Sequence, residues 1–220
     1  MRIKWTCTDA KMFFIGYAGY TTTNIQPEFT RLLADLTTPT SPPTLLFTIF
    51  LGANDACYRT PDTENVPLPT FTTNLKTFLD AILTSPSPSL KATKILLITP
   101  PPINIPSPET SPQPADFPNP KDSRGYRTYR SKKRYADKVL ELANAYTEVS
   151  GGRVVGLDFW SAVVDAGLED QGRGGEVPGS GSGEKYDEDR LPGCGLDTAK
   201  EFADGYFTDG LHLGVRGYRV

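Results

Sequence analysis

The sequence predicts an α/β fold in which a parallel sheet is covered by helices on both faces. Apolar runs of strand length alternate along the chain with segments whose apolar residues recur at helical spacing. Polar or glycine-containing loops join these segments, and such alternation favours a parallel sheet. With 220 residues, of which 38% are hydrophobic, the chain is large enough for one domain with a filled core.

The N-terminal part predicts a strand, a helix and a second strand. Residues 11–15 (KMFFI) are an apolar run that ends in a glycine-rich loop, which suits a buried strand. Residues 27–36 follow Thr23 and Asn24, either of which can cap a helix. The apolar residues of this helix are Phe29, Leu32, Leu33 and Leu36. Residues 44–51 (TLLFTIFL) are continuous and β-rich, as expected for a strand buried on both faces of a parallel sheet.

The rest of the chain predicts two strands and three helices. Residues 68–83 and 126–149 predict long helices, because their apolar residues recur at helical spacing. Residues 94–99 (KILLIT), closed by three prolines, and residues 153–157 predict strands. Asp158 begins a short helix. The expected core faces are Phe71, Leu75, Phe78, Leu79 and Ile82 in the first long helix, and Tyr135, Val139, Leu142, Ala143 and Tyr146 in the second.

Two stretches of unusual composition interrupt these elements. Prolines crowd residues 99–120, and glycines crowd residues 167–195 together with charged and small residues. We interpret both as loops inserted into a single domain over residues 1–220, and we expect neither to supply a buried element.

Composition and charge argue against several function classes. A net charge of −3 provides no basic field for nucleic acid. No segment approaches the run of about 20 apolar residues that a membrane helix needs, and the first residues lack the apolar core of a signal peptide, so we expect a cytoplasmic protein. Cys7, Cys57 and Cys194 are widely spaced with no CxxC pair, so we expect no metal and no cofactor.

The only histidine, His212, stands three residues after Asp209 in the segment Thr208 to Leu213. On a turn, this spacing lets a carboxylate reach the imidazole Nδ1, fix the tautomer and leave Nε2 free as a general base. The alternative is an ordinary histidine beside a helix-capping aspartate, and for a lone Asp-x-x-His this alternative is the more frequent one.

Two glycine-containing turns follow predicted strands. Asn54, in Gly-Ala-Asn-Asp after the strand 44–51, could point its side-chain amide over the carboxyl edge of the sheet, where an oxyanion forms in acyl transfer. Gly19, in the loop after residues 11–15, could offer its backbone N–H for the same purpose. A plain strand-ending turn explains the Asn54 segment equally well, because turns favour the same residue types. For the Gly19 segment a flexible turn between strand and helix is locally the more frequent explanation.

Taken together and in this order, these motifs resemble those of the SGNH/GDSL hydrolase superfamily. More narrowly, the sequence resembles the isoamyl acetate-hydrolysing esterases and their relatives, through AGYTT (18–22), FLGAND (50–55), ITPPP (98–102) and DGLHL (209–213). The tyrosine-rich helix containing RYADKVLELA and the VVGLDFW segment add to the resemblance, which spans nearly the whole chain.

The resemblance implies a three-layer α/β/α fold with a flavodoxin-like sheet, and hydrolysis of small carboxylic esters through an acyl-serine intermediate. It implies that His212 is the general base and acid, that Asp209 orients it, and that Gly19 and Asn54 are oxyanion donors. The family's serine, in a Gly-Asp-Ser motif at the end of the first strand, has no counterpart here, because no serine precedes Ser41.

That gap leads to further expectations. We expect the first strand to be missing, the final helix to be truncated near Val220, and the chain as given to be inactive. Cys7 is a minor candidate for a substitute nucleophile. Two alternatives remain: a non-catalytic relative that keeps the pocket as a binding module, and a flavodoxin-like nucleotide binder. The second is disfavoured because no glycine-rich loop with a basic residue follows a predicted strand.

Overall fold

The computed structural model describes residues 16–60, 62–106, 118–176 and 187–220. Its centre is a parallel sheet of β1 (Leu46–Phe50), β4 (Lys94–Ile98) and β5 (Val154–Leu157), in the spatial order β1-β4-β5. The register aligns Leu46 with Lys94. A separate antiparallel hairpin, which the sequence pattern did not indicate, pairs β2 (Tyr58–Thr60) with β3 (Thr63–Glu64).

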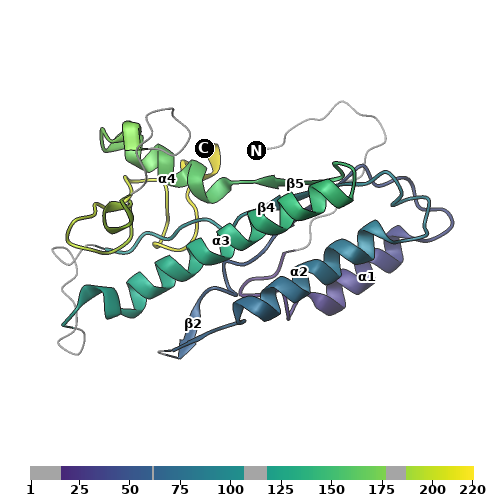
Figure 1. Ribbon diagram of the computed structural model, residues 1–220, viewed down its shortest axis with the longest axis horizontal. Coiled ribbons are helices and arrows are strands. Elements are labelled where there is room, and N and C mark those ends of the chain that lie inside the picture. The colour runs from purple at the N-terminus through teal and green to yellow at the C-terminus, as the bar shows by residue number, and fades with distance from the viewer. Residues whose placement is uncertain (1–15, 61, 107–117, 177–186) are drawn as a thin grey trace.

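Three helices cover one face of the sheet. They are α1 (Gln26–Leu36), α2 (Leu68–Leu83) and α3 (Arg124–Val149), and they lie side by side in Figure 1. Their apolar residues pack on the strand side chains that point the same way, among them Ile49 and Leu97. The predicted parallel sheet with flanking helices is therefore confirmed, and so are the predicted core faces of the two long helices, except that Tyr146 is only partly buried.

The opposite face of the sheet carries apolar side chains that remain exposed. Leu46, Phe50, Val155 and Leu157 are each 42–57% accessible. The prediction that residues 44–51 form a strand buried on both faces is therefore wrong for the described part of the chain. The physical reason is that the helices α1 to α3 all pack on the other face of the sheet. In addition, within the described residues β1 pairs only with β4.

A second core lies under α4 (Phe159–Asp170), which follows β5 directly. Asp158 caps this helix by accepting a hydrogen bond from the Ser161 N–H, as the sequence predicts. Residues 99–103 and 191–196 are buried, and Ile103 and Leu191 belong to this core. Our expectation that neither stretch supplies a buried element is therefore wrong for these segments.

The start of α1 also differs from the prediction. Its N-cap is Ile25, which makes no side-chain capping bond. Asn24 uses its Oδ1 to accept from Thr21 Oγ1 at 2.7 Å, which stabilises the preceding turn instead.

The remaining elements are short 3₁₀ helices, at Pro120–Asp122, Gly174–Glu176, Glu188–Arg190 and Gly217–Arg219. None of the helices in the described ranges is long and apolar enough to cross a membrane. The predicted strand 11–15 and Cys7 lie outside the described residues.

Candidate functional site

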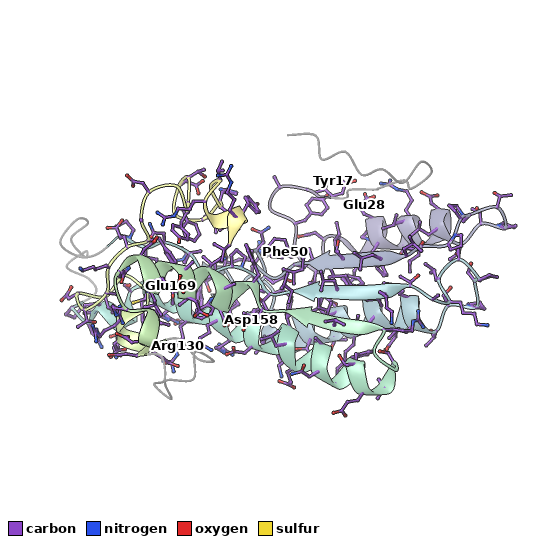
Figure 2. All side chains as sticks on the ribbon, turned by 90° about the horizontal axis from the view of Figure 1, so that it is seen from above. Tyr17, Glu28, Phe50, Arg130, Asp158 and Glu169 are labelled. Carbon is purple, nitrogen blue, oxygen red and sulfur yellow. The ribbon has the colours of Figure 1, made fainter. Side chains whose placement is uncertain are left out.

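The turns that carry Asn54 and His212 are attached to segments that follow the carboxyl ends of β1 and β4. Phe50 and Asp158, labelled in Figure 2, mark the carboxyl edge of the sheet at the ends of β1 and β5. The turn that carries Asn54 follows β1 directly. The turn 209–212 is fastened to the loop after β4, because the Asn104 N–H donates to the Gly210 carbonyl at 2.7 Å. In parallel sheets this edge is where ligands bind.

Asp209 and His212 form the pair that their spacing predicts. His212 Nδ1 lies 2.7 Å from Asp209 Oδ2, and Asp209 Oδ1 accepts the backbone N–H groups of Leu211 and His212 at 3.0 and 2.8 Å. The backbone N–H of His212, and then its ring, lower the pKa of Asp209 to about 2. A carboxylate that stays ionised at neutral pH keeps the Nδ1–H tautomer, so Nε2 is the basic nitrogen.

Both side chains are largely exposed, at 73% for His212 and 53% for Asp209. The imidazole is therefore accessible to a ligand from solvent. Within the described residues, no hydrogen bond engages Nε2, which leaves it available to take a proton.

Local backbone geometry builds this turn. Gly210 has φ +80°, and a Cβ there would lie 2.6 Å from the Asn104 carbonyl oxygen, so any other residue would be both strained and too close. Thr208 closes the turn by donating its N–H to the His212 carbonyl at 2.9 Å. The side-chain oxygen of Asn104 accepts the Phe202 N–H at 2.9 Å. Asn104 therefore positions the turn, a role that the sequence pattern did not indicate.

Asn54 sits in the turn 52–55, which we call the Asn54 turn. Its Nδ2 donates to the Tyr20 carbonyl at 2.9 Å. An amide nitrogen carries two hydrogens, so one remains for a ligand. This hydrogen bond fixes the direction of the Asn54 amide. It also links the Asn54 turn to the neighbouring turn, to which the Tyr20 carbonyl belongs.

Gly19 lies in that neighbouring turn, residues 16–22, which we call the Gly19 turn. It is exposed with φ +76°, and its N–H donates to no acceptor among the described residues. The turn is closed by the Tyr20 N–H, which donates to the Tyr17 carbonyl at 3.2 Å. The rings of the two tyrosines stack with their centroids 4.6 Å apart. A free backbone donor beside the Asn54 turn is the arrangement that an oxyanion site requires.

A buried polar network ties the two turns together. The carboxylate of Asp55, which is fully buried, accepts the Thr22 N–H at 3.0 Å and the Thr22 hydroxyl at 2.5 Å. Asn74 of α2 donates to Thr22 Oγ1 at 3.0 Å and to Thr23 Oγ1 at 3.2 Å. Burial raises the pKa of Asp55, and the bonds from Thr22 oppose this shift. These hydrogen bonds hold the turns that carry the two candidate oxyanion donors next to each other.

Comparison with known families assigns the chain to one of them. The family model of the GDSL-like lipase/acylhydrolases matches residues 15–220. The chain belongs to this family. A search of the curated proteins found no match. As a GDSL-like lipase/acylhydrolase, the chain is a hydrolase of the ester type by family, which agrees with a small molecule as substrate.

The hydrogen bonds of this GDSL-like chain connect its predicted site residues in two groups. Asn54 and the Gly19 turn form one group, and Asp209 with His212 forms the other. No hydrogen bond among the described residues joins the two groups. The first serine, Ser41, precedes β1 and donates to the Asp35 carbonyl at 2.8 Å, so it stands at the amino end of the strands, away from this edge.

One further residue of the site was missed by sequence reasoning. Lys132 of α3 is 1% exposed, and its Nζ donates to the Ala53 carbonyl at 2.6 Å, directly under the Asn54 turn. Desolvation lowers the pKa of this lysine. Nothing in the surrounding basic run, RSKKRY, marks it as buried, whereas the polar Asn74 on an apolar helix face was a readable signal for the network.

The described residues contain no group of three histidine, cysteine, aspartate or glutamate side chains that could hold a metal. The chemistry that this site can perform is proton transfer at His212 together with hydrogen bonding to a developing negative charge at the two turns.

Proposed function

We propose that the protein hydrolyses small carboxylic esters by acyl transfer, and that His212 is its general base and then its general acid. The observation that carries this proposal is the contact between His212 Nδ1 and Asp209 Oδ2, at 2.7 Å, with Nε2 unengaged by the described residues. In acyl-transfer enzymes this arrangement takes a proton from a hydroxyl nucleophile and returns it to the leaving group.

Two donors would stabilise the tetrahedral intermediate in this proposal: the Asn54 side-chain amide and the Gly19 N–H. The network around Asp55 supports the assignment, because it holds both turns before substrate arrives. Donors that need no rearrangement during the reaction contribute most to catalysis.

The nucleophile of the proposal is a serine in a Gly-Asp-Ser motif, as the family resemblance implies. Such a serine is absent from the 220 residues given, so we propose that this chain by itself is inactive. The same observation favours a second candidate function, a non-catalytic member of the family that binds esters or acids in the retained site. Cys7, the other candidate nucleophile, lies outside the described residues.

The test compares hydrolysis of short-chain p-nitrophenyl esters by two proteins, the 220-residue chain and a chain extended upstream by a strand that ends in Gly-Asp-Ser. We expect turnover only from the extended protein. Robust turnover by the 220-residue chain that survives Cys7→Ala would contradict the assigned nucleophile. An inactive extended protein that still binds a short carboxylic acid would favour the binding module.

Variants of the extended protein test the individual roles. Asn54→Ala is expected to lower kcat by ~10²–10³, the usual effect of removing one oxyanion donor. Asn144→Ala, on the exposed side of α3, is the matched control and should leave kcat unchanged. Asp209→Asn should cost less than removal of the base, because Asp209 only orients and stabilises the imidazole. Its matched control is Asp204→Asn, an exposed aspartate five residues away.

A further inference from the structure

A thiol and a buried amine meet beneath the Asn54 turn. The Nζ of Lys132 lies 3.7 Å from the Sγ of Cys57, and both groups donate to the carbonyl oxygen of Ala53, at 2.6 Å from Nζ and 3.3 Å from Sγ. The two side chains come from α3 and from the segment before β2. The fold therefore brings together two nucleophilic atoms that are 75 residues apart in the chain.

Within the described ranges Lys132 is buried without a direct ion pair, and the carboxylate that acts on it is the buried Asp55, whose charge opposes the effect of burial on the lysine pKa. The side chain of Lys132 is 1% exposed. Burial lowers the pKa of its ammonium group, which increases the fraction of neutral amine. A neutral lysine amine is a nucleophile, whereas the ammonium is not.

Cys57 differs from the other described cysteine in its access to solvent. Cys57 is partly exposed, and oxidation of a cysteine depends on such exposure. Cys194 is fully buried in the core under α4, and burial raises the pKa of its thiol to about 11. Cys194 is therefore an internal control that shares the chain and the preparation but not the neighbouring amine.

We propose that Cys57 and Lys132 are a modification site, at which peroxide oxidation produces an S–N cross-link between the two side chains. In the first step the Cys57 thiolate attacks hydrogen peroxide, the S–O bond forms, the O–O bond breaks, and the released hydroxide leaves as water. In the second step the lone pair of Lys132 Nζ attacks Sγ, the S–N bond forms, and the S–O bond breaks.

Atoms and electrons balance over the two steps. The hydroxyl of the sulfenic acid leaves with the proton that Nζ loses, as a second water. One peroxide is reduced, the sulfur is oxidised, and the protein loses two hydrogen atoms. Excess thiol reverses the cross-link by reducing the S–N bond, which restores the cysteine and the lysine.

The cross-link acts on the turn that carries Asn54. Sγ loses the hydrogen that it donates to the Ala53 carbonyl, and Nζ keeps a single hydrogen. The Ala53 carbonyl belongs to the peptide bond that leads into Asn54, so the oxidation state of this pair is coupled to the position of a candidate oxyanion donor. This consequence, unlike the cross-link itself, rests on the proposed function.

The experiment treats the folded 220-residue chain with hydrogen peroxide and maps its peptides by mass spectrometry. We expect the peptides of Cys57 and Lys132 to be joined, two hydrogens lighter than their sum, and separated again by thiol. In urea the yield should fall by at least about tenfold, because the effective concentration of the amine is lost. Cys194 should stay unmodified in the folded protein.

Two variants separate the amine from its surroundings. Lys132→Met keeps an aliphatic side chain but no amine, and should give a Cys57 sulfenic acid that dimedone traps. Lys133→Met removes the neighbouring, partly exposed lysine and should cross-link as the parent does. Sulfenic or sulfinic acid at Cys57 without any link in the parent, a Cys7–Cys57 disulfide in its place, or equal linking in urea would overturn the proposal.

Discussion

The bond between Thr22 and Asp55 gives the sharpest test of the network that joins the two turns. Thr22→Val keeps the shape of the side chain and removes its hydroxyl. The buried Asp55 carboxylate then loses a donor at 2.5 Å, and Asn74 loses an acceptor at 3.0 Å. A hydrogen bond to a charged group contributes about 1.5–3 kcal/mol and a neutral one about 0.5–1.5 kcal/mol. We therefore expect Thr22→Val to lower the free energy of unfolding by about 2–4 kcal/mol.

The neighbouring threonine is the matched control. Thr23 is exposed, and among the described residues its hydroxyl accepts only from Asn74, at 3.2 Å. Thr23→Val should cost less than about 1 kcal/mol. Urea unfolding, followed by far-UV circular dichroism, measures the free energy of unfolding of both variants and of the parent. The comparison requires that the free energy depends on urea concentration with the same slope in all three proteins. Equal losses in the two variants would refute the inference that Asp55 and Thr22 hold the turns together.

The pH dependence of the Thr22 effect has a definite sign. Burial raises the pKa of Asp55 above its ordinary 3.8, so ionising this carboxyl costs folding stability as the pH rises through that window. The bonds from Thr22 reduce the cost, because they lower the pKa again. The stability difference between parent and Thr22→Val should therefore be larger at neutral pH than at pH 3.8. A difference that shrinks towards neutral pH would contradict this assignment.

Three further outcomes are expected. Asn104→Ala should cost about 1–3 kcal/mol in urea unfolding because the Phe202 N–H loses its acceptor, whereas Asn104→Asp, which keeps an oxygen there, should cost less. Val154→Ala should cost about 2 kcal/mol, because the side chain is fully buried, and Val155→Ala less than about 0.5 kcal/mol, because half of it is exposed; similar costs would contradict the one-sided packing of the sheet. In an NMR titration of His212→Ala, the pKa of Asp209 should rise but stay below 3.8, because the backbone N–H groups remain; a return to 3.8 would assign the shift to the ring alone.

Much of the fold is readable from the sequence because helix and strand periodicity report local burial directly. The apolar spacing of residues 68–83 predicts α2 at its observed bounds, and the apolar runs at 94–99 and 153–157 predict β4 and β5 within two residues. Asp158 as a helix cap is equally local, since the bond is made to a residue three positions away.

The failures concern long-range packing, which periodicity does not report. An apolar run such as 44–51 predicts a strand whose side chains can be buried. It does not show how many helical layers cover the sheet, so the exposure of Leu46 was not predictable. The buried loops depend on contacts between distant segments. Gly195, for example, approaches Ile105 so closely that a Cβ would lie 2.5 Å from its Cγ2.

The same distinction applies to the site. Asp209 and His212 are three residues apart, so their contact could be predicted from spacing. The link between Thr22 and Asp55 spans 33 residues, and the link between Lys132 and Ala53 spans 79, so neither follows from a local pattern. In Lys132, a residue type that normally stays in water is buried, and only the tertiary structure reveals it.

The central claim is that His212 transfers protons in ester hydrolysis, and one kinetic measurement tests it most directly. The protein extended upstream by the Gly-Asp-Ser strand is assayed with a short-chain p-nitrophenyl ester, beside its His212→Ala variant. Because the imidazole moves a proton in both half-reactions, the variant should lose several orders of magnitude in kcat with little change in KM. A His212→Ala variant whose kcat stays close to that of its parent would contradict the account.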